Sequence, residues 1–245
     1  MTGRTMTTTD LVAGLAGGAP NLSAGILTAN LGALDEELRL LERGGAPMVH
    51  TDVMDGVFCP MLTVGAPLVA AQRTSVLKDV HLMIDEPLDK LTPFIRAGAD
   101  VVTFQVESAR NPRRVLQVLG DAVNANDSSR GIVRGVAISP GTPIEVLDPL
   151  LGDLDYVLLL AIDPGWGGQR FAASIPARLA RVRSMAAASG RPILVGVDGA
   201  VTRANIASVA ALRPDVIVSG SAIFDGKAPA ANLAFMQEAV AVHRG

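Results

Sequence analysis

Met48-Val49-His50-Thr51-Asp52-Val53-Met54 is a short apolar run interrupted by an imidazole and a carboxylate. A strand buried on both faces of a parallel sheet should be apolar along its whole length, so His50 and Asp52 need a reason. Side chains at positions i and i+2 of a strand share a face, and we expect these two to project side by side into a barrel interior. A core histidine hydrogen-bonded to its neighbour would explain an isolated His-x-Asp, so the rest of the sequence decides.

Outward from this run, short apolar segments alternate with longer amphipathic ones, the pattern of βα units around a parallel sheet. The eight expected strands are Leu22–Leu27, Met48–Met54, Val80–Ile84, Val101–Val106, Val133–Ile138, Tyr156–Ile162, Ile193–Asp198 and Val216–Ser219. Helical patterns follow them and include Leu31–Arg43, Leu88–Ala97, Ile175–Ala188 and Ala228–His243. A doubly wound open sheet has the same alternation, so the polar residues must distinguish the two folds.

Length and composition fit one α/β domain. The chain has 245 residues, of which 49% are hydrophobic, and no linker divides the βα units. We therefore predict a single-domain (β/α)8 TIM barrel over residues 21–245, which would form the catalytic domain. Residues 1–20 are rich in Thr, Gly and Ala and are predicted to be a loose extension with one short helix at Asp10–Ala16.

Charge and cysteine content exclude several functions. A net charge of -3 and a pI near 5.6 argue against a protein that binds nucleic acid through its backbone phosphates. No signal pattern or membrane-spanning apolar run is present, and Cys59 is the only cysteine. We expect a cytoplasmic protein without membrane or nucleic-acid partners, in which Cys59 is a small buried apolar residue.

Further ionisable groups occur on two other expected strands. His81 lies near the start of Val80–Ile84, and Asp198 ends the apolar run Ile193–Asp198. Reactive groups of TIM barrels come from the C-terminal ends of several strands. Together with His50 and Asp52, these residues offer an N/O ligand set suited to one divalent cation such as Zn, Fe, Mn or Co. The early position of His81 in its strand weakens its case as a ligand.

The two aspartates suggest a proton-transfer reaction. Asp52 and Asp198 belong to the second and seventh strands, which are nearly opposite in a ring of eight, so they could reach a bound molecule from different sides. One carboxylate would remove a proton from a carbon next to a carbonyl, and the other would return a proton to the opposite face. A metal would stabilise the enediolate oxygens. Repulsion between the carboxylates would favour one shared proton.

Glycine-rich turns follow the last three strands and suggest where a phosphate binds. The first is Asp163-Pro164-Gly165-Trp166-Gly167-Gly168-Gln169, and the others contain Gly199-Ala200 and Gly220-Ser221. Glycines let backbone N–H groups close around phosphate oxygens, although each turn alone could be an ordinary loop. Their combination at the place where TIM barrels often hold phosphate favours an anion site.

Four segments together resemble motifs of the ribulose-phosphate 3-epimerase family: Val49–Gly56, Asp79–Ile84, Pro164–Gln169 and Val197–Gly199. The resemblance runs from about Asn21 to Asp225. It implies that His50, Asp52, His81 and Asp198 ligate one divalent cation and that Asp52 and Asp198 are the acid–base pair. It also implies that Met54 and Met83 pack against the enediolate, whereas the methionines alone would be taken as core filler. By the same resemblance, Gly167, Gly168, Gly199, Gly220 and Ser221 surround the phosphate, Gly165 belongs to the same loop, and a homo-oligomer is expected.

Several positions depart from the family's usual motifs. A serine that normally touches the substrate is replaced near the first strand, with Gly25 and Thr28 the nearest candidates. Further changes are Val57, Cys59 and Met61 after the second strand, Gln105 for a histidine, Ala200 for a glycine and Leu160 for a methionine. No expected ligand is lost. D-ribulose 5-phosphate is therefore the first choice of substrate, followed by a six-carbon or otherwise modified ketose phosphate. The alternative function is a barrel that binds a sugar phosphate without turnover.

Two other enzyme classes are poorly supported. A Schiff-base aldolase would need a lysine at the C-terminal end of a strand, and Lys78, Lys90 and Lys227 do not occupy such positions. A dinucleotide-dependent oxidoreductase is disfavoured because no Gly-x-Gly-x-x-Gly motif follows the first strand.

Overall fold

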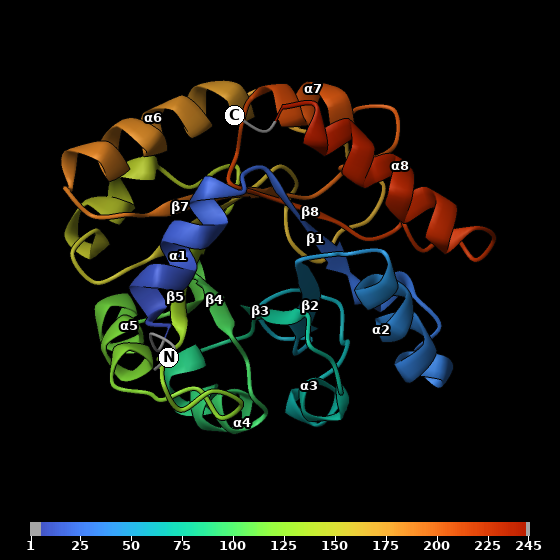
Figure 1. Ribbon diagram of the computed structural model, residues 1–245. Coiled ribbons are helices and arrows are strands. Elements are labelled where there is room, and N and C mark those ends of the chain that lie inside the picture. The colour runs from blue at the N-terminus through green and yellow to red at the C-terminus, as the bar shows by residue number, and fades with distance from the viewer. Residues whose placement is uncertain (1–5, 244–245) are drawn as a thin grey trace, which may run out of the picture.

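The computed structural model describes residues 6–243, in which eight parallel strands close into a barrel with helices around it (Figure 1). The strands are β1 (Asn21–Gly25), β2 (Met48–Met54), β3 (Leu77–Met83), β4 (Val101–Gln105), β5 (Val133–Ile138), β6 (Tyr156–Leu160), β7 (Leu194–Asp198) and β8 (Val216–Ser219). Each strand pairs with its neighbours in chain order, and β8 pairs with β1. The closed ring confirms the TIM barrel prediction and excludes a doubly wound open sheet.

The outer layer consists of helices that cover the strands. They are α2 (Leu34–Arg43), α3 (Ala66–Ala71), α4 (Leu91–Arg96), α5 (Pro112–Gly120), α6 (Ile175–Ala188), α7 (Ile206–Ala211) and α8 (Pro229–Ala241), and a 3₁₀ segment, η5 (Ile144–Leu150), follows β5. Expected helix Ile175–Ala188 is present with the same bounds. Within residues 6–243, no helix is long and apolar enough to cross a membrane.

Two expected helices begin with 3₁₀ turns. The segment Leu31–Arg43 divides into η2 (Leu31–Ala33) and α2, and Leu88–Ala97 begins with η3 (Pro87–Lys90) before α4. Pro93 explains the second case, because a residue without an N–H fits only the first turn of an α-helix. The α-helix therefore starts shortly before the proline, at Leu91.

Strand β3 starts three residues before the predicted Val80, and this difference matters for the site. Lys78 and Asp79 made the start of the strand look polar, but both are buried. On the outer face of the barrel, the Lys78 ammonium donates hydrogen bonds to the carbonyl oxygens of Val69 at 2.9 Å and Ala97 at 3.1 Å. These bonds replace hydration that the buried ammonium group loses. His81 is thus well inside the strand, opposite Asp52 in the β2–β3 register.

Strand β1 ends two residues earlier than predicted, at Gly25, and a 3₁₀ turn, η1 (Ile26–Thr28), follows. A Cβ atom at Gly25 would lie 3.0 Å from the Cα of Gly220. The close approach of the chain segments after β1 and β8 therefore favours glycine at this position.

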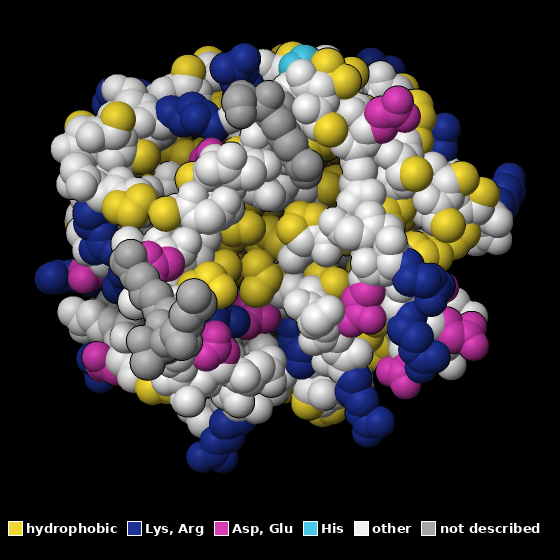
Figure 2. Space-filling model, in the orientation of Figure 1, with side chains coloured by type: hydrophobic (Ala, Val, Ile, Leu, Met, Phe, Trp, Pro, Cys, Tyr) yellow, Lys and Arg dark blue, Asp and Glu magenta, His cyan; other side chains and the backbone are white. Residues whose placement is uncertain are grey.

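A helix that precedes the first strand closes the N-terminal end of the barrel. Helix α1 (Thr8–Gly17) includes the expected helix Asp10–Ala16 and is capped by reciprocal hydrogen bonds between Thr7 and Asp10. Its buried residues Leu11, Val12 and Leu15 pack against the interior side chains of the strands. In Figure 1 the helix lies across the end of the barrel that faces the viewer. Figure 2 shows apolar side chains around the helix, with charged side chains mainly at the rim.

The interior changes character from one end of the barrel to the other. Near the N-terminal ends of the strands it contains apolar side chains, among them Met48, Val133 and Leu194. Further along β2 and β3, the residues that alternate on the same face are His50, Asp52, Asp79 and His81. The polar groups therefore collect toward the C-terminal mouth, while α1 seals the opposite end.

Helix α1 is predicted to contribute to the stability of the barrel. Leu15 is only 7% exposed, and Leu15→Ala should lower the free energy of unfolding by about 2–4 kcal/mol, the usual cost of a large-to-small core substitution. Val242, which is 76% exposed, provides the control, since Val242→Ala should change the free energy of unfolding by less than about 0.5 kcal/mol. Urea unfolding measures both, and equal stability of the Leu15→Ala variant and the unsubstituted protein would contradict this role for α1.

Candidate active site

Three strands bring four ionisable side chains together inside the C-terminal mouth. His50 and Asp52 come from β2, His81 from β3 and Asp198 from the end of β7. One ligand atom from each residue lies within 4.8 Å of the others. The Oδ1 atom of Asp52 is 3.1 Å from both the Nε2 atom of His50 and the Nδ1 atom of His81. The Nδ1 atom of His81 is 3.9 Å from the Oδ2 atom of Asp198.

Burial differs between the imidazoles and the carboxylates. The side chains of His50 and His81 are fully buried, whereas those of Asp52 and Asp198 are 23% and 18% exposed. The imidazoles therefore form the floor of the cluster. The carboxylates remain accessible to a molecule that enters from the mouth of the barrel.

The donor set fits a divalent cation. Two imidazole nitrogens and two carboxylate oxygens are ligands that Zn²⁺ and similar ions accept, and their spacing allows one ion between them. Two carboxylates so close together repel each other unless a proton or a cation compensates. The Nε2 atom of His81 has no hydrogen-bond partner among the described residues.

Mutual interactions move the pKa values of the cluster in different directions. Burial would raise the pKa of Asp52, yet the charge of His50 and hydrogen bonds from both histidines hold it well below its ordinary range. Burial and the negative charge of Asp52 raise the pKa of Asp198 to about 6. Burial disfavours a charged His50, but the carboxylates of Asp79 and Asp52 raise its pKa well above the ordinary value. The two site carboxyls therefore differ in proton affinity, as expected for like charges that share a cavity.

Asp79 also belongs to this cluster, although it is not among the site residues expected from the sequence. Its Oδ2 atom is 2.7 Å from the Nδ1 atom of His50 and accepts a hydrogen bond from the Ser23 hydroxyl at 2.8 Å. The signal was its position two residues before His81, which places both side chains on one face. It was missed because β3 was expected to begin only at Val80.

Met54 and Met83, which the family resemblance places against the enediolate, lie next to each other on the mouth side of the cluster. Met54 and Met83 end β2 and β3 and are paired in the sheet register. Each follows a cluster residue by two positions, so each faces the barrel interior on the mouth side of Asp52 or His81. Apolar thioethers at this level would shield the cluster from water.

The glycine-rich turns lie on the other side of the mouth, after the neighbouring strands β6, β7 and β8. Gly165, Gly168 and Gly199 have positive φ angles of 79°, 74° and 99°, which explains why these positions require glycine. Gly167 has open space around its Cα, and Ser221 is exposed just after β8.

Thr28 and Gly165 make closer contacts with other parts of the mouth. Thr28 is exposed in η1, and its hydroxyl oxygen would lie 3.2 Å from a Cβ atom at Gly220. Gly165 instead lies against the loop after β2, where a Cβ atom would come within 2.6 Å of the Cβ of Cys59. Cys59 is itself buried, as predicted.

The remaining departures from the family motifs occupy different environments. The side chains of Val57 and Met61 are 72% and 46% exposed in the loop after β2. Ala200 has a φ angle of 52°, a left-handed conformation that an alanine adopts at some energetic cost. Gln105 is fully buried at the end of β4, and neither polar atom of its amide has a hydrogen-bond partner among the described residues.

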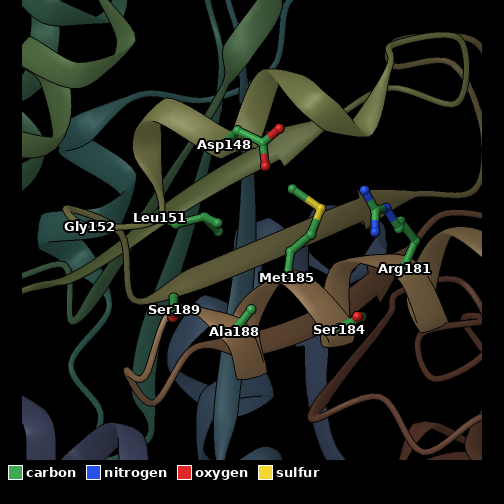
Figure 3. A pocket seen from close by; sticks show the side chains of 8 residues that line it. All are labelled: Asp148, Leu151, Gly152, Arg181, Ser184, Met185, Ala188 and Ser189. Atoms are coloured by element: carbon green, nitrogen blue, oxygen red, sulfur yellow. The ribbon is translucent and has the colours of Figure 1, made fainter.

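A separate surface cavity of about 370 Å³ lies between the η5 segment and α6, in the outer layer (Figure 3). Asp148 and Leu151 lie on one side of it, and Met185 and Arg181 on the other. None of the predicted site residues lines this cavity. With one carboxylate and no imidazole or thiol in its wall, it offers no metal-ligating set.

Comparison with known sequences identifies relatives along most of the chain. The Ribulose-phosphate 3 epimerase family matches residues 21–224. Ribulose-phosphate 3-epimerase of Bacillus subtilis (strain 168) is 37% identical over 202 residues, covering 81% of this chain and 89% of that protein. Ribulose-phosphate 3-epimerase 1 of Cupriavidus necator is 40% identical over 216 residues, covering 84% and 85%. That of Mycobacterium tuberculosis is 36% identical over 222 residues, covering 90% and 93%.

Solved structures with the same fold are more distant in sequence. KGPDC from Streptococcus mutans superposes with a TM-score of 0.67 at 14% identity, covering 93% of this chain and all of that chain. 3-Hexulose-6-phosphate synthase from Salmonella typhimurium gives a TM-score of 0.61 at 17% identity, covering 91% and 99%. At such low identity, these likenesses support the barrel fold alone.

The cluster is predicted to bind one divalent ion per chain. Loss of a residue that merely supports a ligand usually weakens metal binding 10- to 100-fold, so His81→Ala should weaken it by more than about 100-fold. His243, which lies just beyond α8 and outside the cluster, provides a matched control. Isothermal titration with Zn²⁺ or Co²⁺ measures both variants. Equal affinities for His81→Ala and His243→Ala would contradict this assignment of the site.

Proposed function

The chain belongs to the ribulose-phosphate 3-epimerase family, and from this premise we propose that it inverts C3 of D-ribulose 5-phosphate to give D-xylulose 5-phosphate. The relatives that carry this activity in their names cover most of the chain and are themselves mostly covered by it. A phosphorylated ketose is therefore the proposed substrate class. A homo-oligomeric state and a cytoplasmic location stay predictions.

The convergence of Asp52 and Asp198 supports this reaction most directly. They come from β2 and β7, which are three strands apart in the closed ring, their ligand atoms lie within 4.8 Å, and both remain partly exposed to the mouth. In the proposed mechanism, one carboxylate takes the proton from C3 of the ketose. The other carboxyl, which carries a proton, delivers it to the opposite face of the planar enediolate, so the configuration inverts.

His50, Asp52, His81 and Asp198 would hold one divalent cation, which fits their N/O donor set. When bound, this cation supplies Lewis-acid stabilisation of negative charge on the enediolate oxygens. The donor set suits Zn, Fe, Mn or Co. The residues themselves orient the reacting carbon between the two carboxylates.

Apolar side chains above the cluster would protect the enediolate. Met54 and Met83 face the interior on the mouth side of the aspartate and histidine that precede them by two positions. Exclusion of water at this level strengthens electrostatic interactions within the site and limits protonation by solvent. We therefore assign the methionines to the wall around C3.

The phosphate would bind on the opposite side of the mouth. Gly167, Gly168, Gly199, Gly220 and Ser221 follow β6, β7 and β8, and their backbone N–H groups are the proposed donors to the phosphate oxygens. Thr28 lies beside Gly220 and offers a hydroxyl at the same side. Anchoring the phosphate there would orient the ketose with its C3 toward the cluster on β2 and β3.

A ketose phosphate of different length is the second candidate substrate. The buried amide of Gln105 has no partner among the described residues, and an unpaired buried amide costs free energy unless a ligand or water satisfies it. We therefore assign the Gln105 amide to a hydrogen bond with a hydroxyl of the sugar. A panel that contains D-ribulose 5-phosphate and hexulose 6-phosphates, assayed for C3 inversion, distinguishes the two, and the pentulose should have the highest kcat/KM.

Removal of either proposed acid–base group should abolish epimerisation. Asp52→Asn and Asp198→Asn should each lower kcat by at least about 1,000-fold, because general acid–base groups contribute 10²–10⁴-fold and each aspartate also holds the cation. The measurement is epimer formation in heavy water, with deuterium at C3 followed by NMR. Asp89, an exposed residue of η3, provides the control Asp89→Asn, which should retain full activity.

Epimer formation and deuterium incorporation at C3 together distinguish two results that would contradict the proposal. Full activity of either Asp52→Asn or Asp198→Asn would contradict the two-base mechanism. Deuterium incorporation without any epimer in the unsubstituted protein would instead indicate an enzyme that enolises the ketose but returns the proton to the same face.

A further inference from the structure

Asp79 is a carboxylate enclosed completely by the barrel interior. Its exposure is 0%, and no lysine or arginine pairs with it among the described residues. A buried charge without a cationic partner is costly and must be compensated by hydrogen bonds or by a charged imidazole. Both identified partners act on the same atom, Oδ2: the hydroxyl of Ser23 at 2.8 Å and the Nδ1 atom of His50 at 2.7 Å.

This contact determines where His50 carries its proton. A carboxylate oxygen can only accept, so the Nδ1 atom of His50 must donate a proton to Asp79. The other nitrogen, Nε2, faces the cluster and lies 3.1 Å from Asp52, to which it donates while the ring is charged. Coordination of a cation requires a free lone pair, which Nε2 offers when the neutral ring keeps its proton on Nδ1.

The backbone makes this arrangement rigid. His50 and Asp79 are directly opposite each other in the pairing of β2 and β3. Ser23 belongs to β1, which pairs with the other edge of β2. The three side chains therefore come from adjacent strands, and none depends on a loop for its position.

The second histidine of the cluster lacks such support. His81 directs Nδ1 to Asp52 at 3.1 Å, while its Nε2 atom has no partner among the described residues. The two imidazoles therefore differ: one is fixed by a buried carboxylate and the other is not. This contrast singles out Asp79 as the group that orients one ligand.

We propose that Asp79, held by Ser23, is a positioning residue that locks His50 in the Nδ1–H tautomer and thereby presents Nε2 to a divalent cation. The inference rests on the proposed metal site. Asp79 does not touch the substrate in this role. Asp79 raises the metal affinity, because it restricts His50 to the Nδ1–H tautomer and to one ring orientation before an ion binds.

The substitution Asp79→Asn tests the proposal, since an amide can donate to Nδ1 as well as accept from it. The variant should bind Zn²⁺ or Co²⁺ 10- to 100-fold more weakly, the usual effect of losing a partner behind a metal ligand. Ser23→Ala should weaken binding by about 3- to 10-fold, the effect of one ordinary hydrogen bond. Competition with a chromophoric chelator measures each dissociation constant.

Thr103 supplies the matched control. It is fully buried in β4, opposite His81 in the sheet register, and its hydroxyl has no partner among the described residues. Thr103→Val changes a buried polar side chain of the same interior without touching His50. It should bind metal as tightly as the unsubstituted protein, which separates positioning of His50 from general disturbance of the barrel.

A spectroscopic readout completes the test. Nitrogen-15 NMR of the Zn²⁺-loaded protein distinguishes a protonated Nδ1 from a protonated Nε2, and His50 should show Nδ1–H with Nε2 bound to the metal. Unchanged metal affinity in Asp79→Asn, or an Nδ1-bound metal in the unsubstituted protein, would overturn the proposal. If Asp79→Asn does not fold, Ser23→Ala and the NMR measurement still decide.

These readouts also separate this inference from the proposed function. An unsubstituted protein that binds no divalent ion would contradict the metal site itself. An unsubstituted protein that binds metal but whose affinity is independent of Asp79 would contradict only the positioning role. Epimerase activity enters neither measurement.

Discussion

The in-register pairing of β2 and β3 is the constraint on which the site depends. It places His50 opposite Asp79 and Asp52 opposite His81, all on the face that points into the barrel. Because each strand contributes alternate residues to that face, two strands alone assemble three of the four proposed ligands and the group that orients one of them. A shift of one residue in either strand would turn these side chains toward the outer helices. The closed ring then needs only Asp198, from β7, to complete the cluster.

The barrel keeps its polar groups in one half of its interior. Helix α1 and the apolar residues near the strand N-termini close one end, and the ionisable groups are buried toward the other. Burial has an electrostatic consequence, because it raises the pKa of Asp198 to about 6 while the imidazoles hold that of Asp52 low. The glycine-rich turns after β6, β7 and β8 face the same mouth from the other side, where the proposed function places the phosphate, away from the reacting carbon.

The sequence predicted the architecture and the four clustered residues because both follow from local patterns. His50, Asp52 and Asp198 stand out as polar groups in apolar strands, and the alternation of strands and helices marks the βα units. Asp79 and the true start of β3 were missed, because the partners that make Lys78 and Asp79 acceptable inside a strand come from distant segments: Val69 and Ala97 for the lysine, Ser23 and His50 for the aspartate. The packing of α1 against the barrel was missed for the same reason. Its sequence is only weakly amphipathic, and its buried face is defined by contacts with the interior of the closed barrel.

The proposed reaction requires that one ion be shared by four side chains, those of His50, Asp52, His81 and Asp198. X-ray absorption spectroscopy of the protein loaded with one equivalent of Zn²⁺ tests this most directly, because the multiple scattering of imidazole rings counts histidine ligands. The account predicts two imidazole nitrogens and two carboxylate oxygens at about 2.0–2.2 Å from the metal. A spectrum with one imidazole or none, or with water as the main ligand, would contradict it.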